Sequence, residues 1–248
     1  MICNPRLIRS IHTSCVQLKK VPNKAKSHSS HQWLSRQMTD PFVELAKTKN
    51  YRCRSAFKLI EINERAKILQ PGQTVIDCGA APGSWTEIAV SETNADGKQK
   101  KKPKGFVIGL DLLTIHPIEG AHLLSHADFT DTKTQDRIRE LLNGRKIDCV
   151  LSDMAPNATG VRTLDQDKIM DLVHSVLQFA VLMSSENASL LVKIWDNGNV
   201  KKFEEVALRY YKSIKQIKPE ASRGDSAERF LLAKEFRGLE NITKSDST

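Results

Sequence analysis

TVIDCGAAPGSW, from Thr74 to Trp85, is the stretch of this sequence that decides the fold. Its first half is an apolar run that contains β-branched residues, which is typical of a buried strand. Two glycines then precede an amphipathic segment, so a strand, a tight turn and a helix are predicted in succession. Glycines at such a turn let the backbone approach a ligand closely. The stretch therefore predicts a ligand site at the carboxyl edge of a sheet.

Outward from this stretch, apolar runs alternate with amphipathic segments as far as Phe236. Strands are expected at Thr74–Gly79, Gly105–Leu112, His122–Asp128, Ile147–Met154, Ala188–Trp195, Ser213–Pro219 and Arg229–Lys234. Helices are expected at Ser55–Leu69, Ser84–Thr93, Thr132–Asn143, Leu164–Ser185 and Val200–Tyr211. Several strands are nearly continuous apolar runs, as expected where helices cover both faces. The pattern predicts an α/β fold with a doubly wound, mostly parallel seven-stranded sheet and helices on both faces.

Composition narrows the class of protein. The chain has 248 residues and a formal net charge of +9, which favours a polyanionic partner. Its mean hydropathy of −0.39, and the lack of a long uncharged apolar run, predict no membrane span. None of the cysteines forms a CxxC pair, so neither a zinc site nor a disulfide framework is expected, and no other metal site is predicted. The cysteines are Cys3, Cys15, Cys53, Cys78 and Cys149.

Three regions are predicted along the chain. Residues 1–40 hold seven Lys or Arg and no acidic residue before Asp40, which indicates a mitochondrial transit peptide or, alternatively, a disordered basic arm. Residues 41–236 form the folded domain, and residues 237–248 are a polar C-terminal tail. Within the domain, residues 94–104 hold five lysines in eleven positions and are expected to form a surface loop. Whether this loop contacts a nucleic acid is open.

The glycine-rich turn distinguishes between nucleotide ligands. Gly79 and Gly83 are spaced GxxxG with Asp77 two residues earlier, which resembles the D-x-G-x-x-x-G loop of methyltransferases and lacks the GxGxxG of dinucleotide sites. S-adenosylmethionine has no pyrophosphate, and an acidic loop suits its amino-acid end. Asp111 and Asp128 close the next two expected strands, where carboxylates can accept ribose hydroxyls and the adenine amino group. The cofactor contacts expected from the loop and the strand ends are Asp77, Gly79, Ala80, Pro82, Gly83, Asp111 and Asp128.

A lysine inside an apolar strand needs an explanation. Lys193 lies in such a strand, and Asp153 ends another, so the two form either a structural ion pair or a functional one. At this point the chain resembles a known family, the FtsJ/RrmJ ribosomal RNA 2′-O-methyltransferases. The resemblance runs from about Pro41 to Phe236 through five motifs in the same order. The motifs are Tyr51–Ile62, Asp77–Trp85, Ser152–Asn157, Val192-Lys193 and Ser222–Glu228.

The resemblance implies a Rossmann-like fold and S-adenosylmethionine-dependent methylation of a ribose 2′-hydroxyl. It implies a catalytic tetrad at Lys58, Asp153, Lys193 and Glu228, and it places Trp85 and Asp153 among the cofactor contacts. We expect Lys193 to be the general base; in the alternative assignment Lys193 only positions the hydroxyl, whose proton leaves late to water. Arg52, Arg54 and Arg223 are expected, with Lys58, to flank the site and contact RNA phosphates. The chain departs from the family pattern at Ser84, in the loop at residues 158–165 and in the longer lysine-rich loop, which bears on substrate fit.

Targeting and resemblance together imply the substrate: a uridine in mitochondrial large-subunit (16S-type) rRNA. A monomeric matrix enzyme acting on this rRNA or a pre-ribosomal particle, and supporting large-subunit assembly, is expected. Two alternatives stay open: a 2′-O-methyltransferase of tRNA or of the mRNA cap, and a non-catalytic ribosome-assembly factor with the same fold. An NAD-dependent oxidoreductase is disfavoured because the loop lacks GxGxxG.

Overall fold

The computed structural model describes residues 39–156, 162–195, 200–224 and 226–239. The described residues from Pro41 onward belong to one compact unit, residues 41–248. The expected transit peptide or basic arm lies almost wholly outside the described residues, as does most of the polar tail. No helix among the described residues is long and apolar enough to cross a membrane.

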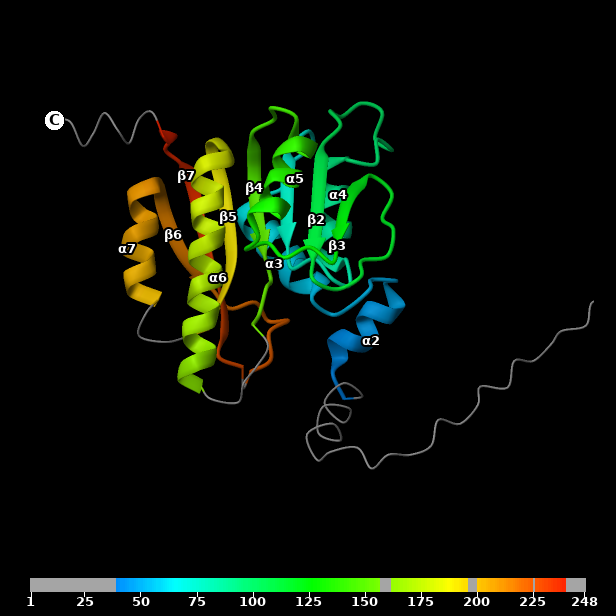
Figure 1. Cartoon of the computed structure of the whole chain (residues 1–248). Helices are drawn as coiled ribbons and strands as arrows, with labels where there is room; N and C mark the ends of the chain where they lie inside the picture. The colour runs from blue at the N-terminus through cyan, green and yellow to red at the C-terminus, as the bar shows by residue number, and fades with distance from the viewer. Residues whose placement is uncertain (1–38, 157–161, 196–199, 225, 240–248) are drawn as a thin grey trace, which may run out of the picture. The chain divides into compact units, whose positions relative to one another are not determined.

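This compact unit is built on one seven-stranded sheet with helices on both faces (Figure 1). The helices are α2 (Pro41–Thr48), α3 (Ala56–Ala66), α4 (Ser84–Thr93), α5 (Thr132–Leu142), α6 (Arg162–Met183) and α7 (Val200–Tyr210). The strands are β1 (Thr74–Cys78), β2 (Phe106–Asp111), β3 (Ala121–Ser125), β4 (Ile147–Ser152), β5 (Ser184–Trp195), β6 (Tyr211–Ile217) and β7 (Glu228–Phe236). Their order is β3-β2-β1-β4-β5-β7-β6, and β7 runs antiparallel to both neighbours. The predicted mostly parallel, seven-stranded α/β fold is confirmed.

Several element boundaries differ from those predicted, and left-handed residues explain most of the differences. Lys67 and Asn143 have positive φ and end α3 and α5 before the predicted positions. The third strand was predicted to reach Asp128 and this is wrong, because His126 has a φ of 56° and the strand ends at Ser125. Helix α2 was not predicted, since its eight residues are too few to show a helical period.

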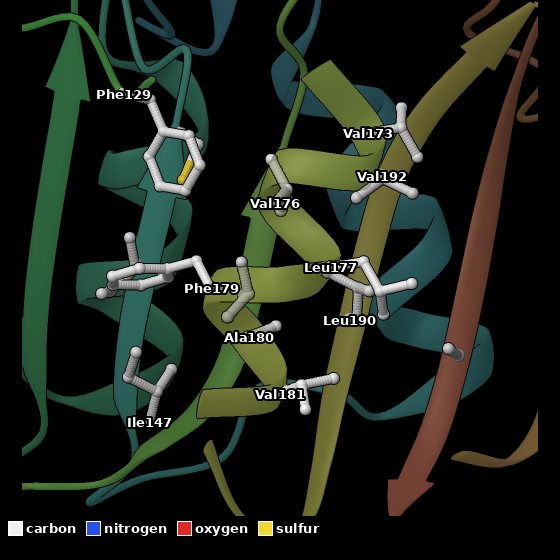
Figure 2. Packing of buried hydrophobic residues seen from close by; sticks show 14 of the residues in the cluster. Phe129, Ile147, Val173, Val176, Leu177, Phe179, Ala180, Val181, Leu190 and Val192 are labelled. Atoms are coloured by element: carbon white, nitrogen blue, oxygen red, sulfur yellow. The ribbon is translucent and has the colours of Figure 1, made fainter. Parts of the chain in front are cut away.

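The face covered by α5, α6 and α7 holds the larger part of the core. Val173, Val176, Leu177 and Ala180 recur at helical spacing along α6 and are buried against the sheet, as Figure 2 shows. The sheet contributes residues such as Val192 to this contact. The apolar stripe predicted along α6 is therefore core packing.

The opposite face is covered by α3 and α4. Its core includes Leu59 of α3 and Ile88 of α4, packed with Leu151 and Leu191 of the sheet. Successive residues of a strand point to opposite faces, so Asp153 and Lys193, each two positions beyond one of these leucines, lie on the α3 side. The fold thus directs both predicted functional side chains to one face at the carboxyl edge of the sheet.

The buried cysteines are part of the core, Cys78 on the α6 side of the sheet and Cys149 on the α3 side. Cys78 and Cys149 are fully buried, as expected, and burial raises the pKa of both thiols. A thiol that keeps its proton is a poor nucleophile and a poor metal ligand. Both cysteines therefore act as small apolar residues.

Candidate active site

The loop after β1 turns at two glycines that need their lack of a side chain. Gly79 has a φ of 81°, and a Cβ there would lie 2.6 Å from Cγ of Met154. Gly83 has a φ of 118°, and a Cβ there would lie 2.8 Å from Nη1 of Arg52. The amide groups of Gly79 and Ala80 both donate to the carbonyl oxygen of Leu110 at the end of β2, at 2.9 and 3.0 Å. The loop is therefore held against the ends of β2 and β4.

A cavity of about 630 Å³ lies beside this loop, at the carboxyl ends of β1, β2 and β4. This volume is within the range of small-molecule sites, roughly 300–1,000 Å³. The residues predicted to contact a cofactor that line it are Gly79, Asp111, Asp128 and Asp153. The others, which lie outside its lining, are Asp77, Ala80, Pro82, Gly83 and Trp85. The structure thus brings four of the predicted contacts to one cavity and leaves the other five outside its lining.

Two carboxylates face this cavity with oxygen atoms in fixed positions. Asp111 accepts hydrogen bonds from the backbone N–H of Ala81 at 2.9 Å and of Leu113 at 2.7 Å. Asp128 accepts hydrogen bonds at Oδ1 from the backbone N–H and the hydroxyl of Thr130, at 2.8 and 2.7 Å. Each carboxylate oxygen has two lone pairs, so both groups retain capacity to accept hydrogen bonds from ligand hydroxyl or amino groups.

Asp77 is fully buried beneath the loop and behaves differently. The hydroxyl of Thr86 donates to its Oδ2 at 2.7 Å, while its Oδ1 is buried and has no hydrogen-bond partner among the described residues. Burial, together with the charges of Asp153 and Asp111, raises the pKa of Asp77 to about 7 against the opposing effect of Thr86. Asp77 therefore joins the end of β1 to α4 and is about half protonated at pH 7.

Trp85 and Arg52 support the loop from behind. Trp85 is buried, its Nε1 donates to the carbonyl oxygen of Ser55 at 2.8 Å, and its ring centroid lies 5.5 Å from that of Phe230. The Arg52 guanidinium donates to Glu87 Oε1 at 2.6 Å and to three carbonyl oxygens. These belong to Pro82, His116 and Pro117, at 2.9, 2.8 and 2.8 Å. These contacts account for the guanidinium within the protein, so an RNA contact by Arg52 stays a prediction.

The structure brings all four predicted tetrad residues to the carboxyl edge of the sheet. Lys193 Nζ lies 2.9 Å from Asp153 Oδ1 and also donates to the Asp153 carbonyl oxygen. Lys58 Nζ lies 2.7 Å from Glu228 Oε1 and 5.5 Å from the Phe230 ring centroid. The four side chains are only 9–17% exposed. The tetrad is thus two nearly buried ion pairs.

Asp153 is ionised in this setting. Burial alone would favour its protonated form, but the nearby ammonium groups of Lys193 and Lys58 outweigh burial. Hydrogen bonds from Lys193 and Ser55 add to their effect, and together these groups hold the pKa of Asp153 below its usual value. The cavity therefore has a negative group at the point where it meets the tetrad.

Two serines that sequence reasoning missed each contact one carboxylate of the tetrad. Ser55 Oγ donates to Asp153 Oδ2 at 2.7 Å, and Ser222 Oγ donates to Glu228 Oε1 at 2.8 Å. Ser55 precedes α3, where a serine hydroxyl ordinarily caps the helix, but it makes no capping hydrogen bond. Its position three residues before Lys58 is the only sequence signal, and that signal predicts a cap.

The other two arginines lie near the tetrad. Arg54 donates from Nη2 to the carbonyl oxygen of Ala221, and its guanidinium carbon lies 5.7 Å from the Phe42 ring centroid. Arg223 is half-buried on the segment between Ser222 and Glu228. Their proposed contacts with RNA stay predictions.

Asp153 is the residue that joins the two parts of the site. It lines the cavity and pairs with Lys193 in the tetrad. A nearly buried amine beside an ionised carboxylate can hold or accept a proton from a hydroxyl placed at the mouth of the cavity. Among the described residues, no group of three His, Cys, Asp or Glu side chains is arranged to bind a metal ion. The geometry suits the transfer of a chemical group from a ligand in the cavity to a hydroxyl that the amine deprotonates.

Comparison with known proteins agrees with this geometry. Residues 51–236 match the profile of the FtsJ-like methyltransferase family. The chain is 57% identical over 215 residues to "rRNA methyltransferase 2, mitochondrial" of Drosophila melanogaster, covering 87% of this chain and 86% of that protein. It is 42% identical over 218 residues to the protein of the same name in Caenorhabditis elegans, covering 86% of this chain and 98% of that protein.

A bacterial relative and a solved structure extend the comparison. The chain is 39% identical over 214 residues to "Ribosomal RNA large subunit methyltransferase E" of Gluconobacter oxydans, covering 86% of this chain and 75% of that protein. A crystal structure from Plasmodium falciparum is 23% identical with a TM-score of 0.66, covering 76% of this chain and 100% of that one. At this identity the structural likeness concerns the fold alone.

Proposed function

The chain belongs to the FtsJ-like methyltransferase family, and we propose that it transfers a methyl group from S-adenosylmethionine to a ribose 2′-hydroxyl of mitochondrial large-subunit rRNA. The observation that carries the proposal is the junction at Asp153, where the tetrad meets a cavity of cofactor size. The reaction needs this junction, because the donor and the deprotonated hydroxyl must meet in line.

The substrate follows from the relatives. Proteins 57% and 42% identical to this chain are named mitochondrial rRNA methyltransferase 2, and this chain is an rRNA methyltransferase of the same type. Bacterial relatives are named for the large ribosomal subunit. A net charge of +9 suits an RNA partner. We infer that the enzyme acts in the mitochondrial matrix, on a uridine of large-subunit rRNA or of a pre-ribosomal particle.

The residues around the cavity fit S-adenosylmethionine. Asp111 and Asp128 would accept hydrogen bonds from the ribose hydroxyls and the adenine amino group. Leu112 and Leu113 are exposed on the cavity lining, where apolar side chains suit an adenine ring. Gly79 leaves space for the amino-acid end. When bound, S-adenosylmethionine supplies an electrophilic methyl group on a sulfonium.

Lys193 is the proposed general base. Its amine, held by Asp153 at 2.9 Å, would accept the proton of the 2′-hydroxyl as the oxygen forms its new bond. Only an unprotonated amine can accept this proton. Asp153 serves chiefly to orient the amine.

Lys58 and Glu228 would hold the substrate side of the site. Their ion pair at 2.7 Å leaves each group partly available to the ribose and its neighbouring phosphate. A positive group beside the reacting oxygen stabilises negative charge as it develops. DNA lacks the 2′-hydroxyl, so only RNA can be the substrate of this reaction.

The test is methyl transfer from labelled S-adenosylmethionine to mitochondrial large-subunit particles from cells that lack this protein. Wild type should label one ribose of the rRNA, and Lys193→Ala should be about 10²–10⁴-fold slower while still binding cofactor. The matched control, Lys215→Ala on the exposed β6, should match wild type.

Other outcomes would redirect the proposal. Cofactor binding without label on these particles would contradict the rRNA substrate and point to tRNA or cap RNA. Absence of both label and cofactor binding would favour a non-catalytic assembly factor. A Lys193→Ala variant that keeps most of its kcat would overturn the base role alone.

A further inference from the structure

The lysine-rich loop between α4 and β2 has a defined conformation that hydrogen bonds hold in place. It is organised by Asn94, which is 1% exposed and has a left-handed φ of 58°. Asn94 Nδ2 donates to the carbonyl oxygens of Gln99, Lys102 and Pro103 at 3.1, 3.1 and 3.2 Å. Its Oδ1 accepts from the backbone N–H of Gln99 at 2.9 Å. One buried side chain therefore fixes the path of the loop across five residues.

Close packing at the end of the loop restrains it further. A Cβ at Gly72 would lie 2.9 Å from Cγ of Pro103, so this proline is seated on the turn before β1. A Cβ at Gly105 would lie 2.6 Å from the side chain of Thr93. The lysines are thus presented from a fixed backbone, which lowers the entropy lost on binding a partner.

The lysines differ in how their charges are balanced. Lys98 is paired with Asp96 at 2.9 Å and with Glu119 at 3.1 Å. The remaining lysines of the loop are exposed, and the described part of the chain gives them no carboxylate partner. They are Lys100, Lys101, Lys102 and Lys104. Holding like charges together is unfavourable unless an anionic partner offsets their repulsion.

Two further cations lie at the same edge of the sheet. Arg145 and Lys146 are exposed on the loop before β4, and the Arg145 guanidinium lies 4.7 Å from the ring centroid of Phe106, the first residue of β2. Strands β2 and β4 flank β1, so their amino ends are close together. We call the six residues Lys100, Lys101, Lys102, Lys104, Arg145 and Lys146 the amino-edge surface.

The amino-edge surface lies at the end of the sheet opposite the tetrad. Loop 94–105 leads into the first residue of β2, whereas Asp153 and Lys193 lie at the carboxyl ends of β4 and β5; in Figure 1 the loop projects from the top of the sheet. The five residues of β1 separate the two ends by roughly 15–20 Å. A partner that contacts both must be a long polyanion.

Resting on the proposed rRNA methyltransferase function, we propose that the amino-edge surface binds backbone phosphates of the substrate RNA as a second contact, remote from the reacting ribose. Lysines bind phosphate as point charges and carry no base readout. Residues 98–104 contain no apolar side chain other than Pro103, whereas a membrane-binding segment needs an apolar face. The surface therefore contributes affinity for long RNA and leaves selection of the nucleotide to the carboxyl edge.

The test removes three charges from the loop. A variant carrying Lys100→Gln, Lys101→Gln and Lys102→Gln is compared with a control carrying three exposed lysines changed elsewhere. The control changes are Lys201→Gln, Lys202→Gln and Lys215→Gln. Binding of rRNA is measured by filter retention over a salt series, and methyl transfer is measured on ribosomal particles and on a short RNA.

The loop variant should bind rRNA more weakly and with less salt dependence. Three lost phosphate contacts lower the slope of log K against log salt by about 2, so raising salt from about 50 to about 200 mM should weaken wild type roughly twentyfold more than the variant. Its KM for particles should rise, while kcat on the short RNA stays at the wild-type value.

The outcomes separate this inference from the proposed function. If the loop variant has the same salt slope and the same KM as the control, and wild type methylates rRNA, the second contact is overturned and the proposed function stands. Absence of methylation by wild type would overturn the proposed function, and the binding slopes would still decide the RNA contact. In a third outcome, wild type binds phosphatidylcholine–cardiolipin vesicles, the loop variant does not, and the two bind RNA equally. The partner of the amino-edge surface would then be a membrane and not RNA.

Discussion

Ser55→Ala is the substitution that most directly tests how the tetrad is held. The hydroxyl of Ser55 donates to Asp153 Oδ2 at 2.7 Å, on the carboxylate oxygen that Lys193 leaves free. Without it, the carboxylate can rotate away from the geometry that orients the amine. We therefore expect Ser55 to be a positioning residue.

The magnitude follows from this hydrogen bond. A hydrogen bond to a charged group contributes about 1.5–3 kcal/mol, so the productive carboxylate orientation becomes at most about tenfold to hundredfold less populated. We expect kcat to fall by that factor with KM for RNA little changed. Since Ser55 helps to hold the pKa of Asp153 down, that pKa should rise toward its usual range in the variant.

Stability distinguishes this role from helix capping. A capping serine changed to alanine costs about 0.5–2 kcal/mol, but Ser55 makes no cap hydrogen bond, so the melting temperature should change little. Ser55→Thr, which keeps the hydroxyl, should restore kcat, and Ser91→Ala on the exposed face of α4 is the control. A Ser55→Ala variant with wild-type kcat would refute the reasoning.

Three further predictions concern the loop and its supports. Gly79→Ala should lower the free energy of unfolding by about 1–3 kcal/mol and weaken cofactor binding, because the new Cβ would lie 2.6 Å from Met154; thermal melts and calorimetric titration measure both. Arg52→Gln should lower the melting temperature yet keep the salt slope of RNA binding, and a smaller slope would instead establish a phosphate contact. Asp77 has a pKa of about 7 when folded and 3.8 ordinarily, so its carboxyl lowers stability by about 4 kcal/mol as pH rises between these values. The Asp77→Asn variant should not lose stability over this pH range. If the melting temperatures of wild type and Asp77→Asn change in parallel with pH, the raised pKa of Asp77 is contradicted.

The order of the helices and strands could be predicted because local sequence patterns indicate each element. Apolar runs and helical periods identify all seven strands and five of the helices, including α4 at its observed bounds. The ends of α3 and β3 could not be predicted. Lys67 and His126 adopt a left-handed backbone conformation there, which neither a lysine nor a histidine indicates in a sequence. The short α2 shows no period and was missed for that reason.

The site was only partly predictable from the residues themselves. Asp111 ends β2, Asp128 and Asp153 follow β3 and β4, and Lys193 lies near the end of β5. The carboxyl ends of parallel strands share one edge. Lys58, by contrast, is an ordinary-looking helical lysine whose role depends on its 2.7 Å contact with Glu228, 170 positions later. The resemblance to a family supplied both residues. Ser55 was missed altogether because its pattern is that of a helix cap.

Glu228 shows why one strand of this sheet must run antiparallel. It is the first residue of β7 and pairs with Trp195, the last residue of β5, so it lies at the carboxyl edge beside Lys58. Were β7 parallel to β5, its first residue would lie at the opposite edge, roughly 30 Å away along a strand of nine residues. Ser222 would be carried away with it, and the ion pair to Lys58 would be lost. The reversal of β7 is therefore a condition for assembling the tetrad, and no local pattern around Glu228 encodes it.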